Sequence, residues 1–248
     1  MGTSSARWAP TGKLWRSARG AARRYLAPEA GGVAAGEVVA RYVAALEASP
    51  GEEAPGALAA FRLTRKAAQN FGAWAGAALS RGRAAALADW GLPDLEGQPP
   101  EVMAQALTAA LAGQGFDLES EVARSSLASL LLQILSPSSP GPADGSGPEI
   151  PPSTDFPAAT WVQAFLATAL YQRLVLDLGG AMEAAAGGLG QLRAGLEGIK
   201  DWLGQAGTEG EAEAPAIPAS PEQWRGLAGW VWVTKVLEAL LSRVGPFA

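Results

Sequence analysis

Residues 117–135 read DLESEVARSSLASLLLQIL, and this stretch has both the start signal and the periodicity of an α-helix over 118–135. Asp117 can accept the free N–H groups of the first turn, and Glu121 lies in that turn, where its charge complements the helix dipole. The apolar residues recur at helical spacing and share one face, namely Val122, Leu127, Leu130, Leu131 and Ile134. We therefore expect an amphipathic helix that buries this face.

The composition of the whole chain favours helices over strands. Its 248 residues include 53 alanines but only 12 valines and 4 isoleucines. Alanine is the best helix former, whereas β-branched residues favour strands. Further helical patterns cover residues 13–26, 33–48, 56–80, 83–90, 101–112, 161–186, 187–203 and 222–244. No repeat of the length that builds a solenoid is present, so we expect an irregular all-α bundle of about eight helices.

Two segments without helical periodicity suggest how the chain is divided. Residues 1–12 are small, polar and turn-rich, so they are expected to form a flexible N-terminal tail that reaches roughly 35 Å when extended. Residues 136–156 contain six prolines among Ser and Gly, which predicts an extended linker or a long crossover. The linker separates an N-terminal helical lobe over 13–135 from a C-terminal lobe over 157–248. The two lobes are either separate or parts of one domain.

The residue types that are missing exclude many kinds of chemistry. The chain contains neither cysteine nor histidine, which rules out disulfides, a thiolate nucleophile, a Cys/His zinc site and a histidine general base. The common nucleotide-binding, serine-hydrolase and metalloprotease motifs are also absent. Acidic pairs such as Glu119 and Glu121 lie in loops or helix starts, where carboxylates are usually solvated or complement a dipole. We therefore expect no catalytic residue, no metal site and no enzymatic activity.

Charge is distributed unevenly along the chain, whose net charge is −5. Residues 1–88 carry 12 basic and 5 acidic side chains, whereas residues 89–248 carry 7 and 19. In the helix expected over 13–26, Arg16, Arg19 and Arg23 recur at helical spacing on one face, with Lys13 and Arg24 beside them. Such a basic helix binds nucleic acid, an anionic membrane or an acidic protein surface. Alternatively, it is simply solvated or pairs with the acidic half of the same chain.

A second basic cluster lies between residues 54 and 88, a stretch without any acidic residue, and consists of Arg62, Arg65, Lys66, Arg81 and Arg83. Together with the first helix it could form a composite basic patch that binds nucleic acid. The negative net charge weighs against this interpretation, because a dedicated nucleic-acid-binding protein usually carries a positive one.

The nine tryptophans and the pair Gly72 and Gly76 indicate where the core lies. Eight tryptophans fall in predicted helices, and most are expected to be buried because large aromatic side chains supply the area that alanines cannot. Trp8 lies in the tail and is a candidate anchor for a partner. Gly72 and Gly76 are four residues apart, which predicts close helix packing.

The N-terminus has a chemical feature of its own. Gly2 follows Met1, so removal of the methionine would expose a small glycine amine that a partner enzyme could modify. The myristoylation pattern is not fulfilled, because residue 6 is Ala6.

No secretory signal follows the basic N-terminus before Pro28, and no transmembrane segment is visible. We therefore expect a cytoplasmic protein that does not contact the membrane.

Several short motifs together resemble one known family. They are Met1-Gly2-Thr3-Ser4-Ser5, Trp15-Arg16, Arg41-Tyr42-Val43, Gly91-Leu92, Val122-Ala123-Arg124 and Leu176-Asp177-Leu178-Gly179. In this combination the chain resembles the B component of the Qat anti-phage defence system. The resemblance implies a role in a defence complex beside an ATPase, a QueC-like enzyme and a TatD-like nuclease, in which the B component is not itself the catalyst.

The resemblance also suggests how the N-terminus is used. QueC-like enzymes make 7-deazaguanine nitriles through an activated carboxylate, and transfer of that acyl group to an amine would make Gly2 the acceptor. Thr3, Ser4 and Ser5 would then form the recognition segment. No cofactor is expected besides a covalent 7-deazaguanine-type group at the N-terminus. The alternative is an adaptor whose basic N-terminal helix binds nucleic acid and recruits the nuclease or the ATPase.

Overall fold

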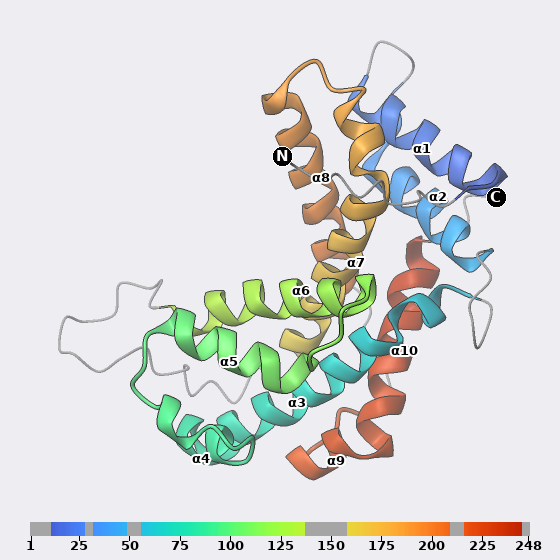
Figure 1. The fold of residues 1–248 in the computed structure, drawn as a ribbon. Helices are drawn as coiled ribbons and strands as arrows, with labels where there is room; N and C mark the ends of the chain where they lie inside the picture. The colour runs from blue at the N-terminus through green and yellow to red at the C-terminus, as the bar shows by residue number, and fades with distance from the viewer. Residues whose placement is uncertain (1–10, 28–31, 49–55, 137–157, 209–215, 245–248) are drawn as a thin grey trace.

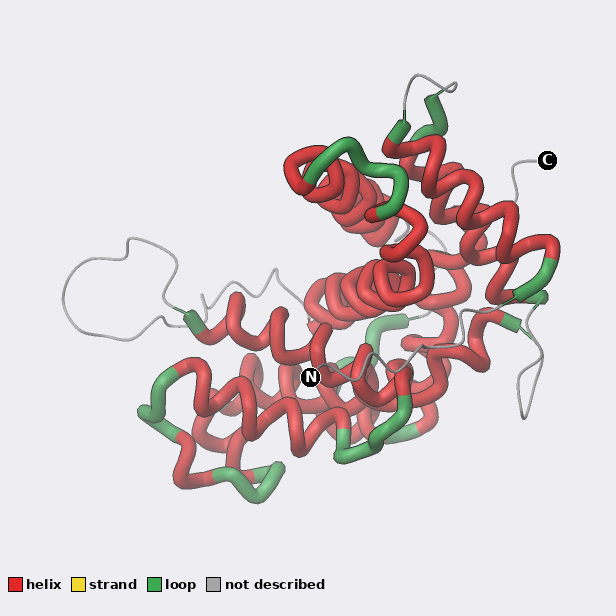
Figure 2. Tube along the Cα trace, turned by 45° about the horizontal axis from the view of Figure 1, so that its top comes forward, coloured by secondary structure: helices red, strands yellow, loops and turns green. Residues whose placement is uncertain are grey.

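The computed structural model describes residues 11–27, 32–48, 56–136, 158–208 and 216–244. Within these ranges the protein contains ten α-helices, eight of them with seven or more residues, two short 3-10 helices and no strand. The expected all-α fold with about eight helices is therefore confirmed (Figures 1 and 2). The N-terminal residues Gly2, Thr3, Ser4, Ser5 and Trp8 lie outside the described residues, as do residues 137–156 of the predicted linker.

One long helix organises the fold. α7 (Ala158–Glu183) packs against α1 (Lys13–Leu26) and α8 (Leu189–Thr208) in one part of the molecule. In the other part it contacts α3 (Arg62–Arg81) and α6 (Leu118–Leu135). At about 1.5 Å per residue, a helix of this length is long enough to span both groups, and Figure 1 shows it running from the first group into the second.

The remaining helices cover this framework. α2 (Ala35–Glu47) lies beside α1, and α5 (Pro100–Ala112) lies beside α6. α4 (Arg83–Ala88) follows α3 directly, while α9 (Pro221–Arg225) and α10 (Leu227–Val244) pack on α3 from the other end of the sequence. Buried residues from both sides of the Pro-rich segment 136–156 join in one hydrophobic core.

The start of α6 is confirmed as predicted. The Asp117 Oδ1 atom accepts a hydrogen bond from the backbone N–H of Ser120 at 2.9 Å, which makes Asp117 the N-cap. The Ser120 hydroxyl also donates to Asp117 Oδ2 at 2.7 Å. This hydroxyl and next the backbone N–H of Ser120 lower the pKa of the Asp117 carboxyl, as expected when N–H and O–H donors stabilise the charged form.

A single continuous C-terminal helix was predicted, and this prediction was wrong. The expected helix over 222–244 is broken at Gly226, which separates α9 from α10. From α3, the Gln69 Nε2 atom donates hydrogen bonds to the backbone oxygens of Arg225 at 2.9 Å and of Gly226 at 2.7 Å. The chain then bends so tightly that a Cβ atom at Gly229 would overlap the backbone of Trp224. A side chain far away in the sequence therefore stabilises the break.

Other predicted helix boundaries were wrong. The helix expected over 187–203 continues as α8 to Thr208, since Leu203 and Ala206 are buried and the Ala206 carbonyl accepts from Arg243 Nη1 at 2.7 Å. The helix expected over 83–90 ends at Ala88, so Trp90 lies in a turn. Gly91 continues that turn with a φ of 71°, a conformation that glycine adopts readily.

The tryptophan prediction holds for only half of the eight side chains, whereas the glycine prediction holds for both positions. Trp15, Trp74, Trp224 and Trp232 are buried in the core, while the other four tryptophans of the described chain are half-buried. A Cβ atom at Gly72 would overlap the ring of Trp224, so α3 and α9 approach each other as closely as the absence of a side chain permits. The close packing predicted from Gly72 and Gly76 is therefore confirmed.

Candidate functional site

The basic helix α1 is held by an apolar face that is almost fully buried. Its buried side chains are Trp15, Ala18, Ala21, Ala22 and Leu26, and the helix packs on α2, α7 and α8. Small alanines let α1 lie close to its neighbours, and Trp15 supplies most of the large apolar surface. At the N-terminal end of α1, residues 11–14 are all exposed. The chain that precedes α1 therefore joins the molecule at its surface.

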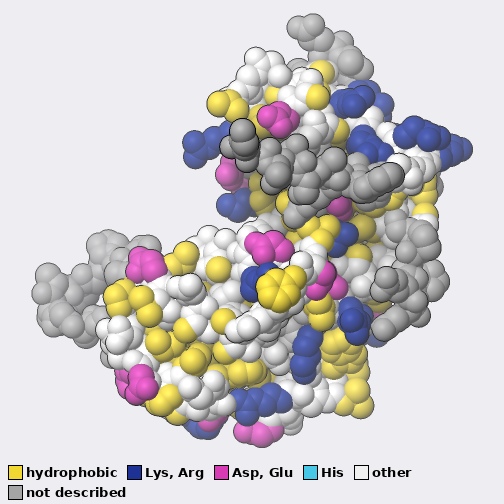
Figure 3. Space-filling model, in the orientation of Figure 1, with side chains coloured by type: hydrophobic (Ala, Val, Ile, Leu, Met, Phe, Trp, Pro, Cys, Tyr) yellow, Lys and Arg dark blue, Asp and Glu magenta, His cyan; other side chains and the backbone are white. Residues whose placement is uncertain are grey.

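The opposite face of α1 carries the predicted basic side chains. Lys13, Arg16 and Arg23 are exposed, and Arg19 and Arg24 are half-buried. Lys13, Arg16, Arg23 and Arg24 form no ion pair with any residue in the described ranges. Figure 3 shows Lys and Arg side chains gathered over the part of the molecule where α1 lies. This face can attract an anionic or acidic partner.

A buried polar cluster connects α1 and α2 to α7. The Trp15 and Tyr42 rings meet edge to face with 5.8 Å between centroids. The Tyr42 hydroxyl donates to Asp177 Oδ2 at 2.8 Å, and Arg173 Nε donates to the same oxygen at 3.0 Å. Burial, and next the Asp177 carboxylate, raise the pKa of Tyr42 well above its usual value. The hydroxyl is thus a fixed donor that joins the N-terminal helices to the central helix.

The C-terminal end of α1 is attached to α8. The Tyr25 hydroxyl donates to the Gly195 carbonyl at 3.1 Å, and Gln191 Nε2 donates to the Leu26 carbonyl. A Cβ atom at Gly195 would overlap the side chain of Leu26, so glycine permits this close approach. α1 is therefore fixed at its C-terminal end and exposed at its N-terminal end.

Three residues of the second basic cluster contact other side chains of the protein, although Lys66 and Arg81 are also exposed. Arg65 lies over the Trp230 ring with 4.6 Å between its guanidinium carbon and the ring centroid. Lys66 Nζ donates to Gln69 Oε1 at 2.9 Å, and Arg81 pairs with Asp89. α3, which carries these three residues, packs on α9, α10 and α4.

The acidic pair Glu119 and Glu121 has two structural roles. Glu119 Oε1 accepts from the backbone N–H groups of Leu63 and of Thr64, the latter at 3.0 Å, so this side chain caps the start of α3. Burial raises its pKa, against a smaller lowering by these two donors. Glu121 pairs with Arg124 at 2.9 Å. The carboxylates are therefore used in helix capping and ion pairing.

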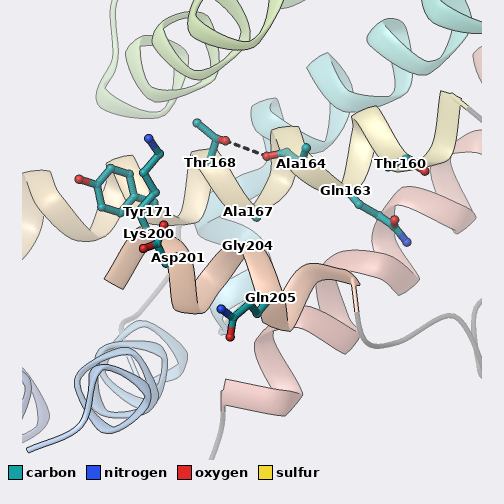
Figure 4. Close-up of a pocket in the computed structure, with 10 residues that line it drawn as sticks. All are labelled: Thr160, Gln163, Ala164, Ala167, Thr168, Tyr171, Lys200, Asp201, Gly204 and Gln205. Atoms are coloured by element: carbon teal, nitrogen blue, oxygen red, sulfur yellow. Dashed lines mark hydrogen bonds between the residues drawn. The ribbon is translucent and has the colours of Figure 1, made fainter. Parts of the chain in front are cut away.

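A groove of about 500 Å³ runs along the seam between α7 and α8 (Figure 4). Its residues are Thr160, Gln163, Ala164, Ala167, Thr168, Tyr171, Lys200, Asp201, Gly204 and Gln205. Thr168 Oγ1 donates to the Ala164 carbonyl at 2.8 Å, so this hydroxyl is already engaged. The sequence analysis did not find this groove. The small residues Ala164, Ala167 and Gly204 were its only sequence signal, and they are common in this chain.

The arrangement of ionisable groups gives no sign of a metal centre in the described part of the chain, where no three acidic side chains cluster. None of the helices described here is both long and apolar enough to cross a membrane.

Comparison with known proteins decides the family. A family model described as "Qat anti-phage system associated protein QatB" matches residues 54–206. The chain belongs to the QatB family. Membership in the QatB family makes this protein part of the Qat anti-phage system. The match runs from α3 to α8 and includes Asp177, Arg173 and the α7–α8 groove, while α1, α2, α9 and α10 lie outside it. No curated protein and no solved structure matches the chain significantly.

Proposed function

We propose that this QatB family member is a non-catalytic interaction subunit of the Qat system that presents its N-terminus to a QueC-like partner enzyme. Membership in the Qat system supports the setting. The observation that carries the proposal is the attachment of α1: its C-terminal end is fixed on α8, and residues 11–14 before and at its start are exposed. The N-terminal chain therefore begins from a fixed, accessible point on the surface.

The proposed reaction takes place at the N-terminal amine. After removal of Met1, the Gly2 amine attacks the activated carboxyl carbon of a 7-deazaguanine-type acyl group held by the partner. The new bond joins the Gly2 nitrogen to the carbonyl carbon, the activating group leaves with its electron pair, and the nitrogen gives up one proton. Glycine suits this role because its amine carries no neighbouring side chain. Thr3, Ser4, Ser5 and Trp8 follow it as the recognition segment.

The basic face of α1 supports docking of the partner. Lys13, Arg16 and Arg23 are exposed, and they lack acidic partners within the described residues. Complementary charge mainly accelerates association and orients the two proteins. An acidic rim around the partner's active site would therefore bring the N-terminus to it. In this proposal the chain itself supplies the acceptor amine and the docking surface, and the partner supplies the chemistry.

Mass spectrometry tests the modification directly. The protein is purified from cells with the complete system and from cells without the QueC-like enzyme, and intact mass and N-terminal peptides are compared. We expect a mass increase confined to the peptide that begins at Gly2, only when the enzyme is present. Gly2→Glu should retain Met1 and abolish both the modification and defence, whereas Ala9→Ser serves as a control elsewhere in the tail. An unmodified Gly2 in the complete system, together with normal defence by Gly2→Glu, would refute the proposal.

A nucleic-acid adaptor is the second candidate function, and the exposed basic face of α1 favours it. It predicts DNA or RNA binding that weakens steeply with salt, because each phosphate contact contributes a slope of about −0.9 in log K against log salt. Changing Arg16, Arg19 and Arg23 to Ala together should weaken binding and reduce the slope by up to about three such units. Lys200→Ala on α8 is the control. Absence of binding at low salt eliminates this candidate.

A further inference from the structure

The first turns of α10 expose an apolar surface that the fold leaves uncovered. Leu227 is 77% exposed and Val231 is 42% exposed, and Trp230 between them is half-buried. Residues at this spacing share one face of a helix. A leucine, a valine and a tryptophan side by side at the surface form the kind of centre that protein interfaces use.

Basic side chains of α3 and α9 border this apolar surface. Arg65 covers one face of the Trp230 ring at 4.6 Å and donates from Nη1 to Thr234 Oγ1 at 3.2 Å, so it is held in place on α10. Arg225 ends α9, and only Gly226 separates it from Leu227. Its guanidinium carbon lies 5.2 Å from the centroid of the Trp90 ring.

A chain of hydrogen bonds keeps these groups together. Lys66 Nζ donates to Gln69 Oε1 at 2.9 Å, and Gln69 Nε2 in turn donates to the carbonyls of Arg225 and Gly226. These hydrogen bonds link Lys66 of α3 to the residues directly before α10. We call Arg65, Lys66, Arg225, Leu227, Trp230 and Val231 the α3–α10 patch. In Figure 3, basic and hydrophobic side chains lie together over the region where Figure 1 places α3, α9 and α10.

The charges around the patch leave cationic groups available. Asp89 is shared between Arg81 and Arg225, at 3.7 Å from the latter, and Glu222 also interacts with these two arginines. Glu238 is paired with Lys235 at 2.7 Å. Lys66 is exposed, and among the described residues it has no acidic partner. The patch thus combines an apolar centre with a cationic edge.

We propose that the α3–α10 patch binds an acidic amphipathic segment of another protein. Aliphatic or aromatic side chains of that segment pack on Leu227, Trp230 and Val231, and a carboxylate of the segment pairs with Lys66. This surface lies on other helices than α1, so it provides a second docking site beyond the one used in the proposed function. The apolar half lies on α10, outside the region matched by the family model.

The structure favours a protein segment over nucleic acid. Arg65 and Arg225 already cover ring faces of Trp230 and Trp90, so these faces do not offer a stacking platform for bases. The most exposed apolar side chain is Leu227, an aliphatic group that an acidic protein helix buries well.

Peptide binding to the full-length protein tests this proposal. The probe is a fluorescent helical peptide with Leu and Phe on one face and Glu on the others, compared with a scrambled peptide of the same composition. We expect the amphipathic peptide to bind at least about tenfold more tightly, and Leu227→Asp to remove that preference. Leu189→Asp is the matched control, because Leu189 is 83% exposed at the start of α8, away from the patch. Equal binding of both peptides, or equal effects of both variants, would overturn the proposal.

Charge reversal and an oligonucleotide probe complete the test. Lys66→Glu should weaken peptide binding by about tenfold or less and reduce its salt dependence, whereas Lys200→Glu should not. Unchanged circular dichroism and melting temperature show that the variants remain folded. A single-stranded oligonucleotide that binds the wild-type protein and loses affinity with Lys66→Glu and Leu227→Asp would identify the patch as a nucleic-acid surface and overturn the proposal.

Discussion

The Tyr42 hydroxyl donates a 2.8 Å hydrogen bond to Asp177 Oδ2, across 135 positions of the chain. Each residue belongs to one of the short motifs by which the chain resembles the Qat family, and the structure brings the two motifs together. Arg173 shares the same carboxylate oxygen, so α2 and α7 are joined at a buried charged pair. Since α1 packs on both helices, this contact also helps to fix the position of α1.

Loss of this hydrogen bond should destabilise the protein. Tyr42→Phe leaves Asp177 with Arg173 but without its hydroxyl donor, and we expect the free energy of unfolding to fall by about 1–3 kcal/mol. Urea denaturation measures the change. Tyr171→Phe is the control, because Tyr171 is half-buried and its hydroxyl makes no hydrogen bond to a described residue. Equal stability of the two variants would show that the Tyr42 contact contributes little.

Alanine at two glycines of α3 should have opposite effects. A Cβ atom at Gly72 would overlap the Trp224 ring, whereas at Gly76 it would lie 3.5 Å from Cδ1 of the same ring, an ordinary contact. Gly72→Ala should therefore reduce the free energy of unfolding by about 1–3 kcal/mol through overpacking. Gly76→Ala should be neutral or raise it by about 0.5–1 kcal/mol, since alanine favours the helix. Thermal and urea denaturation compare them, and a destabilising Gly76→Ala of equal size contradicts this packing.

Glu119 predicts a dependence of stability on pH. Burial raises the pKa of its carboxyl above the ordinary value of 4.5, so its contribution to stability is complete below that value and is lost as the pH rises through the folded-state pKa. Glu119→Gln keeps an oxygen acceptor for the start of α3 but cannot ionise. We therefore compare the free energy of unfolding of Glu119→Gln with that of the wild-type protein at each pH. The difference, variant minus wild type, should be more positive at about pH 7 than at about pH 4.

Urea denaturation of both proteins at the two pH values measures this difference. Glu119→Ala, which removes the cap entirely, should be less stable than Glu119→Gln at both pH values by about 0.5–2 kcal/mol. A stability difference between Glu119→Gln and the wild type that does not vary with pH would contradict the raised pKa.

Gln69 should control the break between α9 and α10. Gln69→Leu keeps the side-chain volume but removes the amide donor to the carbonyls of Arg225 and Gly226. The Gly226 carbonyl retains the backbone N–H of Trp230 at 3.3 Å, and the substitution should cost about 1–3 kcal/mol. Hydrogen exchange should then increase selectively over residues 221–231. A uniform increase over the whole molecule would instead indicate a global loss of stability.

Features with local causes were predicted well from the sequence. α1 and α6 have the predicted bounds, because helical periodicity and signals such as the Asp117 cap lie within or beside each segment. The exposed basic face of α1 followed in the same way, since residues three and seven apart share a face of any helix. Gly72 and Gly76 correctly indicated close packing, although nothing in the sequence identified Trp224 as the partner.

Features that depend on distant residues could not be predicted. The expected helix over 222–244 appeared continuous because Gln69, which binds the carbonyls at the break, lies 156 positions before Arg225. The extension of α8 to Thr208 likewise depends on burial and on Arg243. The α7–α8 groove and the α3–α10 patch are formed by side chains from separate helices, so no segment of sequence contains their pattern.

The sequence by itself determined an all-α fold for the described residues, the lack of histidine and cysteine, a basic first helix and a glycine directly after Met1. Helix formation and residue chemistry are local, and therefore they can be inferred from neighbouring residues. The tertiary structure decided that Tyr42 meets Asp177, that Glu119 caps α3 from α6, and that Arg65 lies on Trp230. These contacts arise only when burial of the apolar faces brings distant helices together, because the choice of partner depends on the packing of the whole core.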